Sequence, residues 1–382
     1  MSQVLAPHTE AELAEMISAG GPFTVEGLGS KRGLGMIAEN RATLSLQTFS
    51  GVSYYEAEEL VLEAGAATPL AAVQALLKQR GQMLAFEPPD YSHLWGSSHS
   101  GSLGGLLATA LAGPRRIKAG SARDHVLGVR GVTGRGEIFK AGARVVKNVT
   151  GYDMPKLMAG SYGTLAALTS VTFKVLPAPE TEETVLVSVR DDAEAMRVMS
   201  DALQSSAEIS AAAHVPGVGT YLRFEGINVS VSARRDRYVS ALRQSCEIIN
   251  AELSHAIWSK IRDCKAIAHD ATRALWRISV APMQGAAVAA HIARQTDARY
   301  FFDWGGGLLW MSVPAAGDGG AVLVRSAFTE GHATLFAAPD ELRRRAEVFQ
   351  PQAPTLAALT ARVKSALDPH GKLNPGRMYK GI

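Results

Sequence analysis

The chain has 382 residues, of which 47% are hydrophobic and 20% charged, a composition typical of a soluble globular protein with two domains. Its 39 basic and 36 acidic residues leave a formal net charge of +3, which is too small to indicate a nucleic-acid-binding protein. Two isolated cysteines exclude a disulfide framework and a metal or iron–sulfur site built on Cys-x-x-Cys. Because there is no apolar run of about 18 residues and no basic secretory signal, we expect a cytoplasmic protein without a transmembrane segment.

The N-terminal half predicts alternating short strands and helices. In chain order we expect strand 23–25, strand 59–65, helix 70–81, strand 82–89, short helix 101–113, a hairpin over 125–142 and strand 168–176. Helix 70–81 is delimited by Thr68 as N-cap, Pro69 at the first helical position and Gly81 at its end, and it lies between two strands in a β-α-β alternation. "PAPE" (177–180) then indicates a domain boundary.

The second half predicts an antiparallel sheet with helices on one face. Its expected elements are strand 184–189, helix 192–204, strands 209–215 and 220–226, helix 232–250, strand 275–282, helix 285–295 and a hairpin over 300–313. A last helix has Leu356, Leu359, Val363 and Leu367 at helical spacing, and the turn-rich C-terminus is expected to fold back. We therefore divide the chain into domains 1–177 and 178–345, with a returning segment 346–382.

The first glycine-rich stretch is "VEGLGSKRGLG" (25–35), directly after a strand. Its unblocked backbone N–H groups and two cations, Lys31 and Arg32, suit a diphosphate. The glycines at 27, 29 and 33 do not have the dinucleotide-binding spacing G-x-G-x-x-G, and "GSSHSGSL" (96–103) lacks the lysine of a phosphate-binding P-loop. A purely structural turn remains the alternative.

Two more stretches combine small and polar residues: "HSGSLGG" (99–105) and the segment 147–165, which precedes a core strand. Gly104 and Gly105 could also serve a helix–sheet contact, and Asn148 and Asp153 a turn and an N-cap. Three such stretches occur within about 140 residues. Together they predict a binding surface made of main-chain groups, on which a long polyanionic cofactor can lie close to the backbone.

The order of these pieces resembles the p-cresol methylhydroxylase/vanillyl-alcohol oxidase (PCMH/VAO) family of FAD-binding proteins. The resemblance rests on the early glycine loop and on four further segments: "SLGG" (102–105), "AGSARDHVLG" (119–128), "KNVTGYD" (147–153) with "GSYGTL" (160–165), and "DPHGKLNPGR" (368–377). Ser102 and Ala166 depart from the family pattern, but both are small. The family implies an α+β fold class, in which a PCMH/VAO-type FAD-binding domain of two α+β subdomains is followed by an antiparallel-sheet α+β cap domain.

Within the family, residues 113–129, "VVKNVTGYD" and "MAGS" are most similar to the FAD-binding E subunits of bacterial glycolate oxidase (glycolate dehydrogenase) complexes. This resemblance implies non-covalent FAD, oxidation of a small 2-hydroxy acid (glycolate to glyoxylate), and two partners, a paralogous flavoprotein subunit and an iron–sulfur subunit. It also implies that any contact with the inner membrane is made through these partners. A free-standing FAD-dependent dehydrogenase or oxidase of another alcohol or acid, and a flavin domain without its own catalysis, remain alternatives.

The resemblance also implies the residues that bind FAD. They are Gly27, Gly29, Ser30, Lys31, Arg32, Gly33, Ser102, Leu103, Gly104, Gly105, Ser121, Arg123, Asp124, Asn148, Gly151, Tyr152, Asp153 and Asn374. Arg123 and Asp124 could instead form a structural ion pair. The chain lacks the histidine-rich motif of the family's α-hydroxy-acid dehydrogenases, so no metal site is expected and the catalytic residues stay unknown. His99 is the nearest candidate for covalent attachment, which we do not expect.

A basic run extends from Arg115 to Lys147, with nine Lys/Arg against Asp124 and Glu137. It could steer an anionic cofactor and substrate, or dock an acidic partner subunit. In the cap, Phe301, Phe302, Trp304 and Trp310 flank three glycines and are expected to be mostly core residues.

Overall fold

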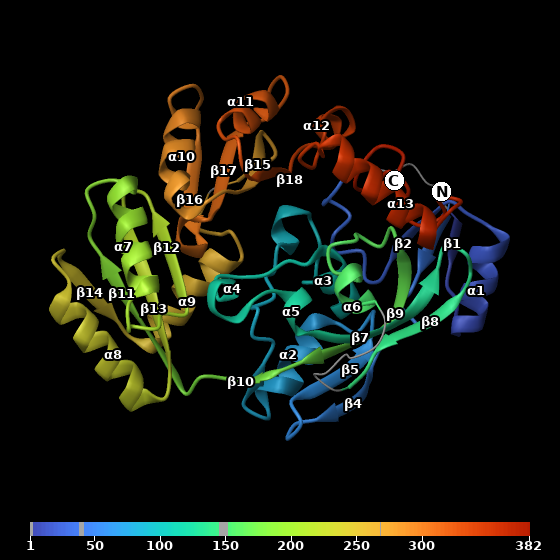
Figure 1. Ribbon diagram of the computed structural model, residues 1–382, viewed down its shortest axis with the longest axis horizontal. Coiled ribbons are helices and arrows are strands. Elements are labelled where there is room, and N and C mark those ends of the chain that lie inside the picture. Colours follow the sequence, from blue (N-terminus) through green and yellow to red (C-terminus); the bar gives the residue numbers. More distant parts are fainter. Residues whose placement is uncertain (1–2, 38–41, 145–151, 268) are drawn as a thin grey trace.

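The computed structural model of the protein describes residues 3–37, 42–144, 152–267 and 269–382 (Figure 1). In the described residues, the N-terminal half contains two main sheets and the two-stranded sheet β10-β6. A parallel sheet has the strand order β1-β3-β2, and an antiparallel sheet has the order β4-β5-β9-β7-β8. The predicted strand before "PAPE" is β9, which lies at the centre of the five-stranded sheet between β5 and β7. The predicted pair of α+β subdomains and the hairpin over 125–142 are thereby confirmed.

The elements of this half are short. The strands are β1 (Gln3–Leu5), β2 (Phe23–Glu26), β3 (Ala42–Ser45), β4 (Val52–Glu56), β5 (Val61–Gly65), β6 (Gln82–Met83), β7 (Val126–Thr133), β8 (Ile138–Gly142), β9 (Ala166–Lys174) and β10 (Leu176–Pro177). The helices are α1 (Glu10–Ala19), α2 (Leu70–Lys78), η1 (Ser92–Leu94), α3 (Leu103–Thr109), α4 (Arg116–Ala119), α5 (Ala122–His125) and α6 (Met154–Met158).

The second half is built on one eight-stranded antiparallel sheet with the order β14-β11-β13-β12-β16-β17-β15-β18. Its strands are β11 (Thr181–Val187), β12 (Ala211–Val215), β13 (Gly219–Gly226), β14 (Cys246–Ile249), β15 (Arg273–Ser279), β16 (Arg299–Asp303), β17 (Leu308–Pro314) and β18 (His332–Ala337). Its helical segments are α7 (Asp192–Gln204), α8 (Asn228–Ala241), α9 (Ala251–Arg262), η2 (Pro282–Gln284), α10 (Gly285–Ala293), η3 (Trp304–Gly306), α11 (Ala321–Ser326) and α12 (Asp340–Arg345).

The side chains of this sheet alternate between two cores, as the period of two in a strand requires. One core contains Ala212 and Phe302 and is covered by α7, α8, α10 and α11. The opposite core contains Ala213 and Phe301, together with Leu34 from the N-terminal half. The prediction that the helices share one face therefore holds for most of them, whereas α9 packs on the other face through its buried Trp258 side chain.

The C-terminal segment returns to the N-terminal half, as predicted. Helix α13 (Pro354–Leu367) leads into a chain that pairs with β2, where Phe23 and Leu373 form a parallel bridge. The buried Lys364 ammonium donates to Asp368 Oδ2 at 2.7 Å and to the Thr164 carbonyl at 2.7 Å. These contacts join three segments that are distant in the sequence.

The predicted strand–helix–strand alternation is present as β5, α2 and β6, and β6 pairs antiparallel with β10. Two local predictions were wrong. Pro69, not Thr68, is the N-cap of α2, because the Thr68 hydroxyl is used on the Gly51 and Gly65 backbone. The expected helix 232–250 ends at Ala241, and residues 246–249 form the edge strand β14 instead.

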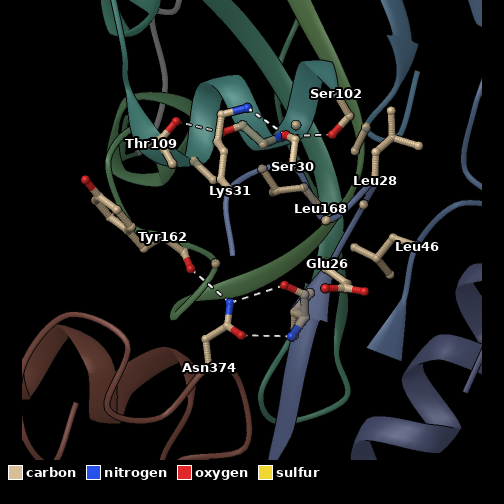
Figure 2. Close-up of a pocket in the computed structure, with 18 of the residues that line it drawn as sticks. Glu26, Leu28, Ser30, Lys31, Leu46, Ser102, Thr109, Tyr162, Leu168 and Asn374 are labelled. Atoms are coloured by element: carbon tan, nitrogen blue, oxygen red, sulfur yellow. Dashed lines mark hydrogen bonds between the residues drawn. The ribbon is translucent and has the colours of Figure 1, made fainter. Parts of the chain in front are cut away.

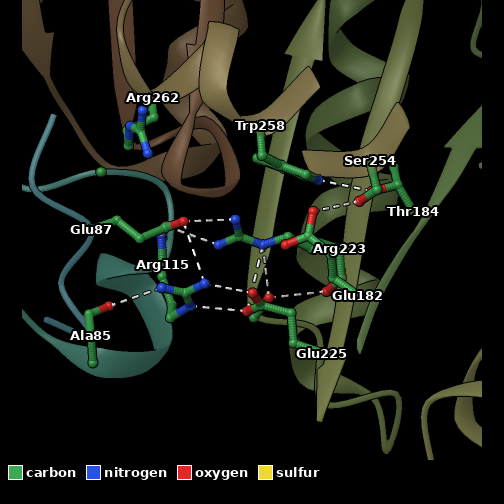
Figure 3. Close-up of polar contacts among 12 residues, drawn as sticks. Ala85, Glu87, Arg115, Glu182, Thr184, Arg223, Glu225, Ser254, Trp258 and Arg262 are labelled. Carbon is green, nitrogen blue, oxygen red and sulfur yellow. Dashed lines mark hydrogen bonds and ion pairs between the residues drawn. The ribbon is translucent and has the colours of Figure 1, made fainter. Parts of the chain in front are cut away.

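A cluster of buried charges joins the two halves (Figure 3). Arg223 in β13 donates to both carboxylate oxygens of Glu87, at 2.8 and 2.9 Å. Arg115 donates to Glu225 at 2.9 and 2.5 Å. Burial alone would raise the pKa of Glu87, but the guanidinium groups of Arg223 and Arg115 hold that pKa at about 2. The four charges compensate one another and connect the halves through polar as well as apolar contacts.

Candidate cofactor-binding groove

An open groove of about 820 Å³ lies between the two subdomains of the N-terminal half (Figure 2). Four segments meet in it: the end of β2 with the following loop, helix α3, the chain before β9, and the C-terminal segment. Nine residues of the predicted site line the groove, namely Gly27, Gly29, Ser30, Lys31, Arg32, Ser102, Gly104, Gly105 and Asn374. The tertiary structure thus brings together stretches that are far apart in the sequence, up to the 349 positions between Val25 and Asn374.

The loop after β2 exposes its main chain to the groove. Gly29 adopts φ 72°, a left-handed conformation that a side chain would disfavour. A Cβ on Gly27 would lie 2.8 Å from Ser102 Oγ. Small residues here keep the loop and the start of α3 in close contact and leave backbone groups accessible.

Lys31 places an ammonium group in the groove without a carboxylate partner. Its Nζ donates to Ser30 Oγ at 3.4 Å and to the Ser100 carbonyl at 3.3 Å, and no carboxylate of the described residues lies within 4 Å. Burial lowers the pKa of Lys31 to about 8, against a smaller opposing effect of Asp90. A buried cation held by neutral groups is suited to an incoming anion.

Arg32 is in a different situation. Its guanidinium donates to both oxygens of Glu26, with an Nε–Oε2 distance of 2.8 Å, and its side chain is 71% exposed. The positive charge of Arg32, which the sequence suggested would bind a diphosphate, is therefore already offset by Glu26.

Helix α3 forms one wall. Its N-cap is Ser102, whose hydroxyl accepts a hydrogen bond from Gly105 N at 3.3 Å. A Cβ on Gly104 would lie 2.7 Å from the Ala66 Cβ, so Gly104 serves the helix–sheet contact. The nearest atom to a Cβ on Gly105 would be Ser102 Oγ at 3.3 Å, so Gly105 is the more accessible of the two. Leu103 is buried in the core.

Asn374 connects three walls of the groove (Figure 2). Its Oδ1 accepts from Val25 N at 2.8 Å, and its Nδ2 donates to the Tyr162 carbonyl at 2.9 Å. Because the side-chain amide is engaged with the backbone, Asn374 positions the groove walls.

The other predicted residues that the structure describes do not line the groove. Gly33 packs against Trp95, where a Cβ would lie 2.5 Å from the ring. Ser121 and Asp124 form a capping box at α5, in which the Ser121 N and Oγ both donate to Asp124 Oδ2 at 2.8 Å. Among the described residues, Asp124 makes these two hydrogen bonds and no ion pair with Arg123.

The stretch before β9 lies only partly within the described residues. Tyr152 is 93% exposed, and Asp153 caps α6 by accepting from Lys156 N at 3.2 Å. Asn148 and Gly151 lie outside the described residues.

Sequence reasoning missed several groove residues. These are Thr24, Val25, Glu26, Leu28, Leu46, Ala66, Ala108, Thr109, Tyr162, Gly163, Ala166, Leu168 and Arg377. Arg377 ends the C-terminal motif that carried the family resemblance, which was the available signal. It donates to the Lys31 carbonyl at 2.6 Å, and burial lowers its pKa to about 10.

The basic run does not act as one positive surface in the described residues. Arg130 pairs with Glu10, Arg144 with Glu63, and Arg115 belongs to the buried charge cluster. Lys147 lies outside the described residues.

The residues present fit a dinucleotide. The groove supplies accessible backbone at Gly27, Gly29 and Gly105 and two cations, Lys31 and Arg377, that form no ion pair with any described carboxylate. These are the groups that bind a diphosphate.

Comparison with known proteins agrees with this reading. The FAD binding domain family matches residues 1–142. The fold and the groove therefore define an FAD-linked oxidoreductase of the PCMH type, with FAD as its cofactor. Over 374 residues the chain is 33% identical to the glycolate oxidase subunit GlcE of Escherichia coli (strain K12), covering 96% of this chain and 95% of that protein. The chain belongs to the GlcE family.

Other similarities are partial. The glycolate oxidase subunit GlcD of Bacillus subtilis is 36% identical over 116 residues, which are 30% of this chain and 24% of that protein. A solved structure of alkyldihydroxyacetonephosphate synthase superposes with a TM-score of 0.65 at 14% identity, covering 97% of this chain and 76% of that chain. The second match concerns the fold alone. Among the described residues, no helix has the length and apolar character needed to cross a membrane.

Proposed function

We propose that this chain is the FAD-binding subunit of a complex that oxidises glycolate, or a close 2-hydroxy acid, to glyoxylate or the corresponding 2-oxo acid. In this complex the electrons pass to an iron–sulfur subunit, and a paralogous flavoprotein subunit is the second partner. The observation that carries the proposal is the end-to-end similarity to GlcE, which includes the cap and the C-terminal segment. Bound FAD supplies the two-electron acceptor that such an oxidation requires.

The chain's own residues would hold the cofactor mainly by main-chain contacts. Backbone N–H groups of the loop 27–31 and the ammonium of Lys31 would bind the diphosphate, with the Arg377 guanidinium beside them. Asn374 would keep β2 and the chain before β9 at the spacing that the cofactor needs. Ser121, Arg123, Asp124, Tyr152 and Asp153 would act outside this groove. We assign no catalytic base.

We also propose a division of labour along the chain. Residues 1–177 and the returning segment 346–382 would form the FAD-binding part, and residues 178–345 the cap. The continuous eight-stranded sheet of the cap and the return of α13 to β2 support these boundaries.

The test begins with the purified chain alone. It should contain about one FAD per chain, released on denaturation, with an oxidised flavin spectrum. Turnover of glycolate with an artificial acceptor should be low alone and rise when the flavoprotein and iron–sulfur partners are added. Rapid turnover by the isolated chain would contradict a dependent subunit and favour a free-standing dehydrogenase. Absence of flavin from the chain, even after incubation with FAD, would contradict both.

A further inference from the structure

The junction between the face of the cap sheet and the N-terminal half contains the charge cluster of Arg223 and also a separate pair of arginines, Arg116 and Arg277. No described carboxylate pairs with either of these two arginines. Arg277 in β15 lies between Trp276 and Ile278, which belong to the core under the helices. It therefore points to the opposite face, toward the N-terminal half. Its cross-strand partner in β17 is Trp310, whose side chain is buried on the same face.

Two arginines share one aromatic ring at this junction. The Arg116 guanidinium, from α4, lies 4.2 Å from the centroid of the Trp304 ring, and that of Arg277 lies 4.9 Å from it. Trp304 is fixed in place, because its Nε1 donates to the Gly113 carbonyl at 3.0 Å. The Trp304 ring is therefore a fixed contact shared by one arginine of the N-terminal half and one arginine of the cap.

Neither arginine is neutralised by an acid. Within the described ranges, no carboxylate oxygen lies within 4 Å of the Arg116 or Arg277 nitrogens, and neither guanidinium donates a hydrogen bond to another described residue. Burial lowers the pKa of both groups, and the charge of Arg277 lowers that of Arg116 further. Arg277 is half-buried and lacks an acceptor among the described residues, which is a costly arrangement for a purely structural role, whereas Arg116 is exposed to solvent.

The titratable groups that face these arginines leave the positive charge in place. Asp303 is buried and accepts from Trp304 N at 2.7 Å, and burial raises its pKa to about 7. Tyr91 and Tyr162 also face Arg277, and burial raises the pKa of both phenols. His332, at the exposed start of β18, has its pKa lowered by burial and then by both arginines. These four groups do not offer a full negative charge at neutral pH. Asp124 is ionised and raises the pKa of Arg116, but its Oδ2 accepts from Ser121 N and Oγ at 2.8 Å and forms no ion pair with Arg116 among the described residues.

The position connects this cluster to the cofactor groove. Tyr162 lines the groove and also packs against the two cores of the cap. Arg277 interacts electrostatically with Tyr162. The cluster therefore lies on the cap side of the residues that line the groove.

We propose that Arg116 and Arg277, held on Trp304, bind the carboxylate of a small 2-hydroxy acid. The planar guanidinium fork matches a carboxylate, and the junction between the halves brings the two forks to one place. This inference rests on the proposed function for the identity of the ligand, but the site itself does not depend on turnover.

The experiment measures ligand binding to the FAD-loaded chain without an electron acceptor. Glycolate is titrated by calorimetry and by its effect on the melting temperature, with ethylene glycol as the matched ligand that lacks the carboxylate. Glycolate should bind and raise the melting temperature, and ethylene glycol should do neither. The Arg277→Met variant should keep its FAD and bind glycolate at least about tenfold more weakly.

The variants separate a binding role from a structural one. Removal of an unpaired buried charge should leave the melting temperature of Arg277→Met without ligand equal to that of the parent or higher, whereas a structural arginine would lower it. Arg116→Gln should weaken glycolate binding in the same direction, by less because Arg116 is exposed. Arg294→Gln, an exposed arginine at the end of α10, is the matched control and should bind glycolate as the parent does.

Each outcome decides the proposal. Unchanged glycolate affinity in both Arg277→Met and Arg116→Gln overturns it, as does absence of glycolate binding to the parent chain, which would favour an acidic side chain of a partner subunit as occupant. If Arg277→Met fails to fold, the glycolate affinities of Arg116→Gln and Arg277→Lys test the proposal instead. Arg277→Lys keeps the positive charge but loses the planar guanidinium, so it should also bind glycolate more weakly. Glycolate that binds at these arginines but is not oxidised by the assembled complex would contradict the proposed function and leave this site standing.

Discussion

Arg223 and Arg277 extend from the same face of the cap sheet toward the N-terminal half, but they have opposite surroundings. Arg223, with 1% of its side chain exposed, meets Glu87 and Ser210 within hydrogen-bond distance. Arg277 meets aromatic rings and another arginine. Both arginines lie at the junction of the two halves, so burial alone does not define their roles. Their roles differ because carboxylates compensate the charge of Arg223 and no described carboxylate compensates that of Arg277.

The cofactor groove repeats this contrast on a smaller scale. Arg32 is paired with Glu26 and exposed, whereas its neighbour Lys31 faces the groove and pairs with none of the carboxylates that the structure describes. A paired cation stabilises the chain around it, and an unpaired one is available to a ligand. The following variants test this distinction, from the largest expected effect to the smallest.

Arg223→Met should be the most damaging change. It leaves Glu87 and Glu225 buried near a single remaining arginine, and breaking a buried ion pair in this way costs about 3–5 kcal/mol of unfolding free energy. Urea denaturation measures the loss, with Arg294→Gln as control. A cost below about 1 kcal/mol would contradict the structural role of the cluster.

The same charge cluster predicts that the free energy of unfolding falls at acid pH. The folded-state pKa of Glu87 is about 2, below the ordinary value of 4.5. Its contribution to stability is therefore present above pH 4.5 and lost as the pH falls toward 2. In Arg223→Met, the contribution of Glu87 to this loss of stability at low pH should be smaller.

Lys31→Met should weaken FAD binding by about 10- to 150-fold, the equivalent of the roughly 1.5–3 kcal/mol of a charged hydrogen bond. Rebinding of FAD to the apoprotein, followed by flavin fluorescence, measures the dissociation constant. In the parent, affinity should also fall as the pH rises through about 8, where the free chain's Lys31 loses its proton.

Arg32→Gln is the matched control for Lys31, because its exposed pair with Glu26 contributes only about 0–1 kcal/mol. Its FAD affinity should change by less than about threefold. An Arg32 effect as large as that of Lys31 would contradict the distinction between paired and unpaired cations in this loop.

Gly104→Val and Gly105→Ala should separate packing from cofactor access. The valine side chain introduced by Gly104→Val would collide with Ala66, so we expect a loss of about 1–3 kcal/mol in stability before any specific effect on flavin. Gly105→Ala should keep or improve stability, but its Cβ would lie 3.9 Å from Lys31 Nζ and should lower FAD affinity. Calorimetric unfolding and FAD content per folded chain distinguish the two, and equal flavin loss at equal stability would contradict this assignment.

Asp153→Ala should have the smallest effect. Loss of the N-cap of α6 should cost about 1 kcal/mol, with FAD affinity unchanged. A clear fall in FAD affinity, measured by the same fluorescence assay, would instead return Asp153 to the cofactor site.

Much of this protein could be predicted from local sequence. Strand periodicity indicated the two hairpins and the central strand β9, and small residues in order marked the segments that build the groove. Failures came where tertiary partners competed with local signals. The Thr68 hydroxyl bonds to the Gly51 and Gly65 backbone and does not cap α2, and residues 246–249 leave the expected helix to pair with β11.

Sequence alone therefore determined the type of protein, because the segments whose order resembles the PCMH/VAO family can be recognised without knowing their tertiary partners. It did not determine which charges are free. Whether Lys31, Arg32, Arg223 or Arg277 meets a carboxylate depends on residues up to 136 positions away, as Arg223 and Glu87 illustrate. That pairing exists only after the two halves pack together, and it separates the cations that hold the fold from those open to a ligand.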